Sequence, residues 1–82
     1  MEQLTLYYLP SCPYCLKVLR FMEKSGIIID LESTSEPANQ QRLLDVGKKN
    51  QVPCLFIGEK PLYESDDIIA YLNERFVSRD KT

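Results

Sequence analysis

The chain has 82 residues, of which 12 are acidic and 10 basic, so its formal net charge is -2. This length is enough for one compact domain and too short for a second core, so we predict a single domain over residues 1–82. Acidic and basic residues are interleaved without a basic stripe, which argues against nucleic acid as a partner. No apolar run approaches the roughly 20 residues of a membrane span, and the first residues lack the pattern of a secretory signal. We therefore expect a cytoplasmic protein that does not bind membranes.

The chain has three cysteines and no histidine, which limits the kinds of catalytic and metal-binding sites that it can form. In a reducing compartment the close pair Cys12 and Cys15 indicates redox chemistry or metal binding rather than a structural disulfide. Without histidine there is no Cys–His arrangement, so a reactive thiolate needs another source of activation. A mononuclear zinc site usually has four ligands, and here it would need a carboxylate or a second chain. We predict no metal site.

The first half of the chain predicts a strand, a helix and a second strand. Residues 4–9 are rich in β-branched and aromatic side chains and end at Pro10, which indicates a largely buried strand. Pro13 suits the first helical position, and Gly26 ends the helix that follows it. Apolar residues in that segment recur at helical spacing: Cys15, Val18, Leu19 and Met22. Residues 27–31 form a second apolar run, which predicts a central strand.

The second half predicts a helix, a hairpin and a last helix. Pro37 opens the first of these helices, over residues 38–49, which offers Leu43, Leu44 and Val46 for packing. Residues 53–57 and 61–63 flank a tight turn at residues 58–60. Ser65 is a good N-cap for a helix that runs to about residue 77. The order β-α-β-α-β-β-α predicts an α/β protein with a four-stranded mixed sheet and helices on both faces.

Cys12 and Cys15 lie where the first helix begins, and this placement favours redox chemistry. If Cys12 caps the helix, its sulfur lies near unpaired backbone N–H groups and a partial positive charge, which favour the thiolate. Cys15 is one turn further, close enough to attack a mixed disulfide at Cys12. We interpret Cys12 as the nucleophile and Cys15 as the resolving thiol. The alternative is a structural pair in which Cys15 is a small buried side chain.

The segment Cys12-Pro13-Tyr14-Cys15 after the first strand, with Val52-Pro53 opening a later one, resembles the dithiol glutaredoxins across nearly the whole chain. The resemblance implies a thioredoxin fold. It also implies that Pro53 follows a cis peptide bond opposite Cys12, and that the backbone of Val52 pairs with the cysteinyl part of glutathione. A trans Pro53 that starts an edge strand is the alternative. Tyr14 is expected to be exposed and to flank the ligand.

Glu64-Ser65-Asp66 is similar to the γ-glutamyl site that glutaredoxins share with the amino-terminal domain of glutathione transferases. Ser65 at a helix start offers its hydroxyl and backbone N–H groups to a carboxylate, and Asp66 suits an ammonium group. An ordinary capped helix with acidic residues in its first turn is the alternative. No segment remains for an all-helical transferase domain, so we do not expect a complete transferase.

Three departures from the glutaredoxin pattern affect the expected contacts. Leu9 replaces a common Lys or Arg, so the glycine carboxylate of glutathione is assigned to Lys49 or Lys17, whose alternative is a solvated surface lysine. Tyr63-Glu64 replaces a frequent Gly-Gly pair, as in the transferases. Cys54 directly follows Pro53; it is either a buried small side chain or a redox or regulatory thiol.

The resemblance implies a monomeric glutathione-dependent thiol–disulfide oxidoreductase. Glutathione is the expected reductant, with no tightly bound cofactor, and the expected partners are disulfide-containing or glutathionylated proteins. A reductase recharged by thioredoxin reductase is one alternative. The other is a dimeric module that binds an iron–sulfur cluster through Cys12 and glutathione; the resemblance implies that Pro13 disfavours it.

Overall fold

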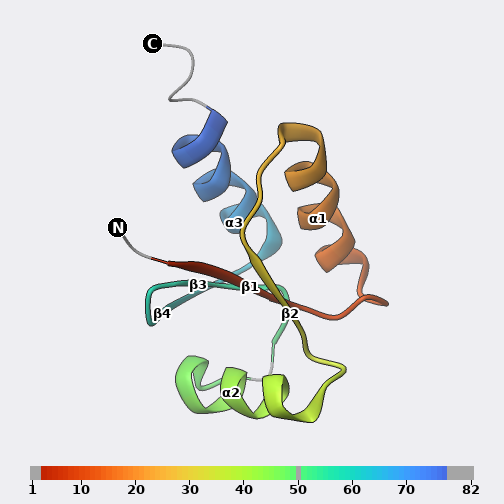
Figure 1. Ribbon diagram of the computed structural model, residues 1–82, viewed down its shortest axis with the longest axis vertical. Helices are drawn as coiled ribbons and strands as arrows, with labels where there is room; N and C mark the ends of the chain where they lie inside the picture. Colours follow the sequence, from red (N-terminus) through yellow and green to blue (C-terminus); the bar gives the residue numbers. More distant parts are fainter. Residues whose placement is uncertain (1–2, 50, 78–82) are drawn as a thin grey trace.

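A four-stranded sheet lies at the centre of the protein in the computed structural model, which describes residues 3–49 and 51–77 (Figure 1). Its strands are β1 (Leu4–Tyr8), β2 (Asp30–Ser33), β3 (Cys54–Ile57) and β4 (Lys60–Tyr63), in the spatial order β2-β1-β3-β4. β1 pairs with β2 in parallel, whereas β3 is antiparallel to both β1 and β4. The predicted mixed sheet and the predicted order of elements are confirmed.

Helices cover both faces of this sheet, as Figure 1 shows. Helices α1 (Pro13–Ser25) and α3 (Ser65–Leu72) lie together on one face, and α2 (Pro37–Gly47) lies on the other. Side chains of a strand alternate between the two faces, so each face has its own core. The α1–α3 side buries Leu4, Leu6, Val18, Met22, Ile27, Leu55, Ile68 and Leu72. The α2 side buries Tyr7, Leu43, Cys54 and Phe56.

The prediction of a central strand over residues 27–31 is wrong in both place and extent. β2 begins only at Asp30 and forms an edge of the sheet. Gly26, with φ of 69°, ends α1, and the Ile27 N–H bonds to the Met22 carbonyl at 2.9 Å. Ile27 therefore belongs to a Schellman cap and packs on the α1–α3 core, whereas Ile28 is 91% exposed. The first residue of the apolar run therefore caps α1, and the strand begins only three residues later.

The two later helices also differ from their predicted bounds. α2 ends at Gly47 because Lys48 adopts φ of 67°, and of its three expected packing residues only Leu43 is buried. α3 begins with Ser65 itself, so the N-cap position falls on Glu64 and not on Ser65. Beyond Leu72 the chain continues as a wider π-helical turn, Asn73–Val77, instead of the predicted α-helix.

Within residues 3–49 and 51–77, no helix is both long and apolar enough to cross a bilayer.

Candidate active site

Helix α1 starts directly after Cys12, as the sequence predicts. After β1 the chain turns so that the Cys12 N–H bonds to the Leu9 carbonyl at 3.0 Å. Cys12 then takes the N-cap position with extended backbone angles (φ -85°, ψ 122°), Pro13 follows at the start of the helix, and the Leu16 N–H bonds to the Cys12 carbonyl at 3.0 Å. The sulfur of Cys12 is thus attached at the positive end of the helix dipole, next to donors that have no partner within the helix.

The pKa of the Cys12 thiol lies below its ordinary value. Partial burial is the largest single influence and raises the pKa, but three hydrogen bonds act in the opposite direction and together outweigh it. They come from the backbone N–H and the thiol of Cys15 and from the backbone N–H of Tyr14. These donors lie in the first turn of α1, so the helix start supplies the activation that a histidine provides elsewhere.

Cys15 has the opposite environment. It is buried in the α1 face toward the sheet, and burial raises the pKa of its thiol to about 11. The Leu9 N–H donates to its sulfur at 3.4 Å and lowers the pKa in part, while the neighbouring Cys12 raises it. The pKa of the Cys12 thiol is thus lowered and that of the Cys15 thiol is raised, so Cys12 ionises more easily than Cys15.

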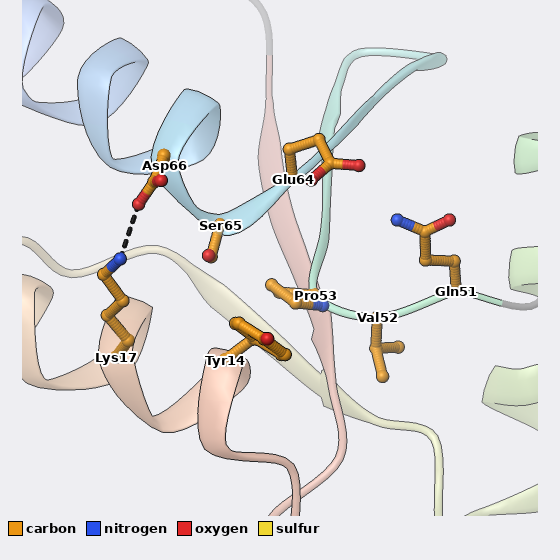
Figure 2. Close-up of a pocket in the computed structure, with 8 residues that line it drawn as sticks. All are labelled: Tyr14, Lys17, Gln51, Val52, Pro53, Glu64, Ser65 and Asp66. Atoms are coloured by element: carbon orange, nitrogen blue, oxygen red, sulfur yellow. Dashed lines mark hydrogen bonds and ion pairs between the residues drawn. The ribbon is translucent and has the colours of Figure 1, made fainter.

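A pocket of about 450 Å³ opens beside the start of α1 (Figure 2). This volume falls within the range of small-molecule sites. Six of the residues considered for glutathione binding line it, together with two others; the full lining is Tyr14, Lys17, Gln51, Val52, Pro53, Glu64, Ser65 and Asp66. The structure thus brings together side chains from α1, from the segment before β3 and from the start of α3. Tyr14, 63% exposed, connects the pocket to the cysteine segment.

The segment before β3 forms one wall of this pocket. The Val52–Pro53 peptide bond is cis, as the resemblance implied, and Pro53 is buried at the pocket wall. Gln51 extends this wall to the end of the pocket farthest from Lys17 (Figure 2). Gln51 was not among the residues predicted from the sequence, although its position directly before Val52-Pro53 was a signal that could have identified it.

The start of α3 forms the opposite wall. Ser65 is only 9% exposed, and its hydroxyl points into the pocket (Figure 2). That hydroxyl makes no hydrogen bond to any residue that the structure describes. Glu64, in the N-cap position, has φ of 74°, a backbone region that favours glycine. The helix start thus offers an unused hydroxyl and free N–H groups to an anion, with the carboxylates of Glu64 and Asp66 on either side.

The two lysines considered for the glycine carboxylate have different positions. The Lys17 ammonium lies 2.5 Å from the Asp66 carboxylate, so it links α1 to α3 at one end of the pocket (Figure 2). Lys49 is not among the lining residues; its ammonium lies 5.2 Å from the centre of the Tyr63 ring. Its assignment to glutathione stays a prediction.

Cys54 is fully buried in the core on the α2 side, next to Pro53 in the chain. Burial raises the pKa of its thiol to about 11, although interactions with the Tyr63 hydroxyl and the Leu62 backbone lower it in part. The Tyr63 hydroxyl donates its proton to the Gly47 carbonyl at 2.8 Å. In this structure Cys54 is the buried small side chain that the sequence left as one of two alternatives.

Across residues 3–49 and 51–77, no three His, Cys, Asp or Glu side chains are grouped so that they could hold a metal ion.

Comparison with known proteins connects this geometry to two groups. The family model for the glutathione S-transferase N-terminal domain matches residues 6–80. Glutaredoxin 1 of Rickettsia typhi is 28% identical over 71 residues, which are 83% of this chain and 68% of that protein. A glutaredoxin of Neisseria meningitidis serogroup B is 30% identical over 61 residues, or 72% of each protein. Glutathione transferase Omega 3C from Trametes versicolor is 26% identical, with a TM-score of 0.79 over 93% of this chain; the chain spans 33% of that transferase.

Proposed function

Because the chain belongs to the family of glutathione S-transferase N-terminal domains and is related to glutaredoxins over most of its length, we propose that it is a glutathione-dependent thiol–disulfide oxidoreductase. Its substrates are protein disulfides and mixed disulfides of proteins with glutathione, and glutathione supplies the electrons. Cys12 carries this proposal: it lies at the N-cap of α1 with a lowered thiol pKa, two residues from the pocket-lining Tyr14.

The reaction of a glutathionylated protein needs only Cys12. The Cys12 thiolate attacks the glutathione sulfur, the protein thiolate leaves and takes up a proton, and glutathione is then joined to Cys12 by a disulfide. A second glutathione thiolate attacks the sulfur of the bound glutathione, which releases oxidised glutathione and restores the Cys12 thiolate. The lowered pKa of Cys12 supports this role both as attacking and as leaving group.

The reaction of a protein disulfide also uses Cys15. Cys12 attacks one substrate sulfur, and the other substrate sulfur leaves as a thiol. Cys15 then loses its proton, attacks the Cys12 sulfur and releases the second substrate thiol, leaving a Cys12–Cys15 disulfide that two glutathione molecules reduce. The raised pKa of Cys15 keeps it as a thiol until a mixed disulfide forms beside it.

The pocket supports a glutathione pose along its length. The backbone of Val52, held by the cis bond to Pro53, takes the cysteinyl part, and Tyr14 flanks it from α1. Ser65 and the start of α3 take the γ-glutamyl carboxylate, and Asp66 takes the ammonium group. We propose Lys49 for the glycine carboxylate.

Reduction of β-hydroxyethyl disulfide with glutathione, glutathione reductase and NADPH tests this function. We expect turnover by the wild-type protein and none by Cys12→Ser. Cys15→Ser should retain activity on glutathionylated proteins and lose it on protein disulfides. Cys54→Ala is the matched control, because it removes the third thiol without touching the pocket lining. Full activity of Cys12→Ser would refute the proposal.

Two further assays on the wild-type protein and its cysteine variants test two alternative functions. Replacing glutathione by thioredoxin reductase and NADPH tests the donor, and turnover only with the reductase would overturn the choice of glutathione. Conjugation of glutathione to 1-chloro-2,4-dinitrobenzene tests a transferase activity, which the family match makes the second candidate. Conjugation without disulfide reduction would contradict the assignment of Cys12 as a redox nucleophile.

A further inference from the structure

The Lys17–Asp66 ion pair crosses one end of the pocket and has no part in the chemistry described so far. Lys17 projects from α1 and Asp66 from the first turn of α3, and both side chains line the pocket (Figure 2). Their side chains are 53% and 81% exposed, so water reaches both charges. Exposed ion pairs of this kind contribute little to stability, which means that a ligand with matching charges can replace the contact at small cost.

The charges around the pocket select for a ligand end that carries both signs. Lys17 contributes one positive charge to the lining, and Glu64 and Asp66 contribute two negative ones. A simple anion at this end would meet the start of α3 favourably and the two carboxylates unfavourably. A group that bears a carboxylate and an ammonium on one carbon would satisfy Lys17, Asp66 and the free hydroxyl of Ser65 together.

We propose, resting on glutathione as the ligand proposed above, that Lys17 is a specificity-determining residue for the γ-glutamyl end. When glutathione binds, the Lys17–Asp66 ion pair breaks. The Lys17 ammonium then pairs with the α-carboxylate of the γ-glutamyl group, and the Asp66 carboxylate pairs with its α-ammonium group. This assignment moves Lys17 away from the glycine carboxylate. Lys17 and Gln51 lie at opposite ends of the pocket, so an extended tripeptide with its γ-glutamyl group at α3 directs its glycine away from Lys17 (Figure 2).

Peptide analogues of glutathione that each lack one charge test whether Lys17 and Asp66 exchange each other for the charges of the γ-glutamyl group. 4-Aminobutanoyl-cysteinylglycine has the amine and no α-carboxylate, whereas glutaryl-cysteinylglycine has the carboxylate and no amine. Each peptide, and glutathione itself, is presented as a mixed disulfide with thionitrobenzoate. Attack of the Cys12 thiolate on the peptide sulfur then releases the coloured thiolate, and the single-turnover rate constant reports how well each peptide is held.

The expected pattern is selective for each charge. Lys17→Gln should slow uptake of glutathione by roughly fivefold and leave uptake of the 4-aminobutanoyl peptide unchanged, since that peptide has no carboxylate for Lys17. Asp66→Asn should slow uptake of glutathione and leave uptake of the glutaryl peptide unchanged, since that peptide has no amine for Asp66. Lys24→Gln is the matched control, because Lys24 lies on the same helix and does not line the pocket. It should change none of the rates.

Two results would overturn the exchange. If Lys17→Gln slows glutathione and the 4-aminobutanoyl peptide equally, the ion pair only holds α1 against α3. If Lys17→Gln slows neither, Lys17 does not contact the carboxylate. Failure of the proposed function is distinct: the wild-type protein would then take up glutathione no faster than either analogue.

Discussion

Gly47 is the position where a single added methyl group tests the packing behind the pocket. It is the last residue of α2, and a Cβ there would lie 2.5 Å from the hydroxyl oxygen of Tyr63. The next nearest atoms, in Leu43 and Phe56, are each 3.5 Å away and leave ordinary contact distance. Tyr63 directly precedes Glu64 of the pocket wall. Gly47→Ala therefore displaces one hydroxyl group that adjoins the candidate site.

The free energy of unfolding should fall in this variant. Replacing a helical glycine by alanine is worth about 1 kcal/mol of stabilisation. Against this, overpacking costs about 1–3 kcal/mol, and loss of the Tyr63 hydrogen bond to the Gly47 carbonyl costs about 1 kcal/mol. We expect Gly47→Ala to be less stable than the wild type by roughly 1–3 kcal/mol.

Tyr63→Phe supplies the matched background, because it deletes only the oxygen that the new methyl group would meet. Alone it should cost about 1 kcal/mol, the value of the lost hydrogen bond. Adding Gly47→Ala to it should then cost nothing or stabilise slightly, so the two changes are not additive. Urea denaturation of the four proteins, followed by circular dichroism, measures this. A Gly47→Ala protein as stable as the wild type, or additive losses in the double variant, would refute the packing described for Tyr63.

Three further predictions concern ionisation and backbone conformation. Alkylation by iodoacetamide should modify Cys12 at neutral pH and leave Cys15 unmodified, since the pKa of Cys12 is lowered and that of Cys15 is raised to about 11; mass spectrometry after digestion distinguishes them. The pKa of Cys54 is raised to about 11 in the folded protein, so its thiol stabilises the fold fully below the unfolded pKa of about 8.5 and progressively less as the pH rises toward 11. Cys54→Ala should therefore lose less stability than the wild type as the pH rises from about 8.5 to about 11 in denaturant titrations, and an equal loss would contradict this. Glu64→Gly should be more stable than Glu64→Ala by about 1 kcal/mol, because only glycine adopts φ of 74° without strain; thermal unfolding at neutral pH compares the two, and equal midpoints would count against strain at this position.

The placement of the cysteine pair was predictable from the sequence because it depends on neighbours in the chain. Pro13 at the first helical position and an apolar run at helical spacing place Cys12 at a helix start and Cys15 one turn inside. The same local reasoning located the hairpin after Pro53, and it placed the start of the last helix within one residue. The resemblance added the cis bond before Pro53, which no local pattern could have indicated.

Predictions failed where a segment's environment is decided by distant partners. The apolar residues 27–31 matched a buried strand, but Ile27 is used by the cap of α1, and β2 lies at an edge. The sequence likewise offered Lys17 only as a candidate for the glycine carboxylate of glutathione or as a solvated surface lysine. Only the packing of α1 beside α3 brings it to Asp66, 49 residues further along the chain.

By itself, then, the sequence determined the order of elements, the mixed sheet and the place of Cys12 at a helix start, because helix starts, caps and turns are set by residues a few positions apart. The tertiary structure alone decided which strand lies at the edge, that Ser65 presents an unpaired hydroxyl opposite Pro53, and that Lys17 and Asp66 share one end of the pocket. These features depend on how helices and strands far apart in sequence pack across a common sheet, and the pattern along the chain does not contain that information.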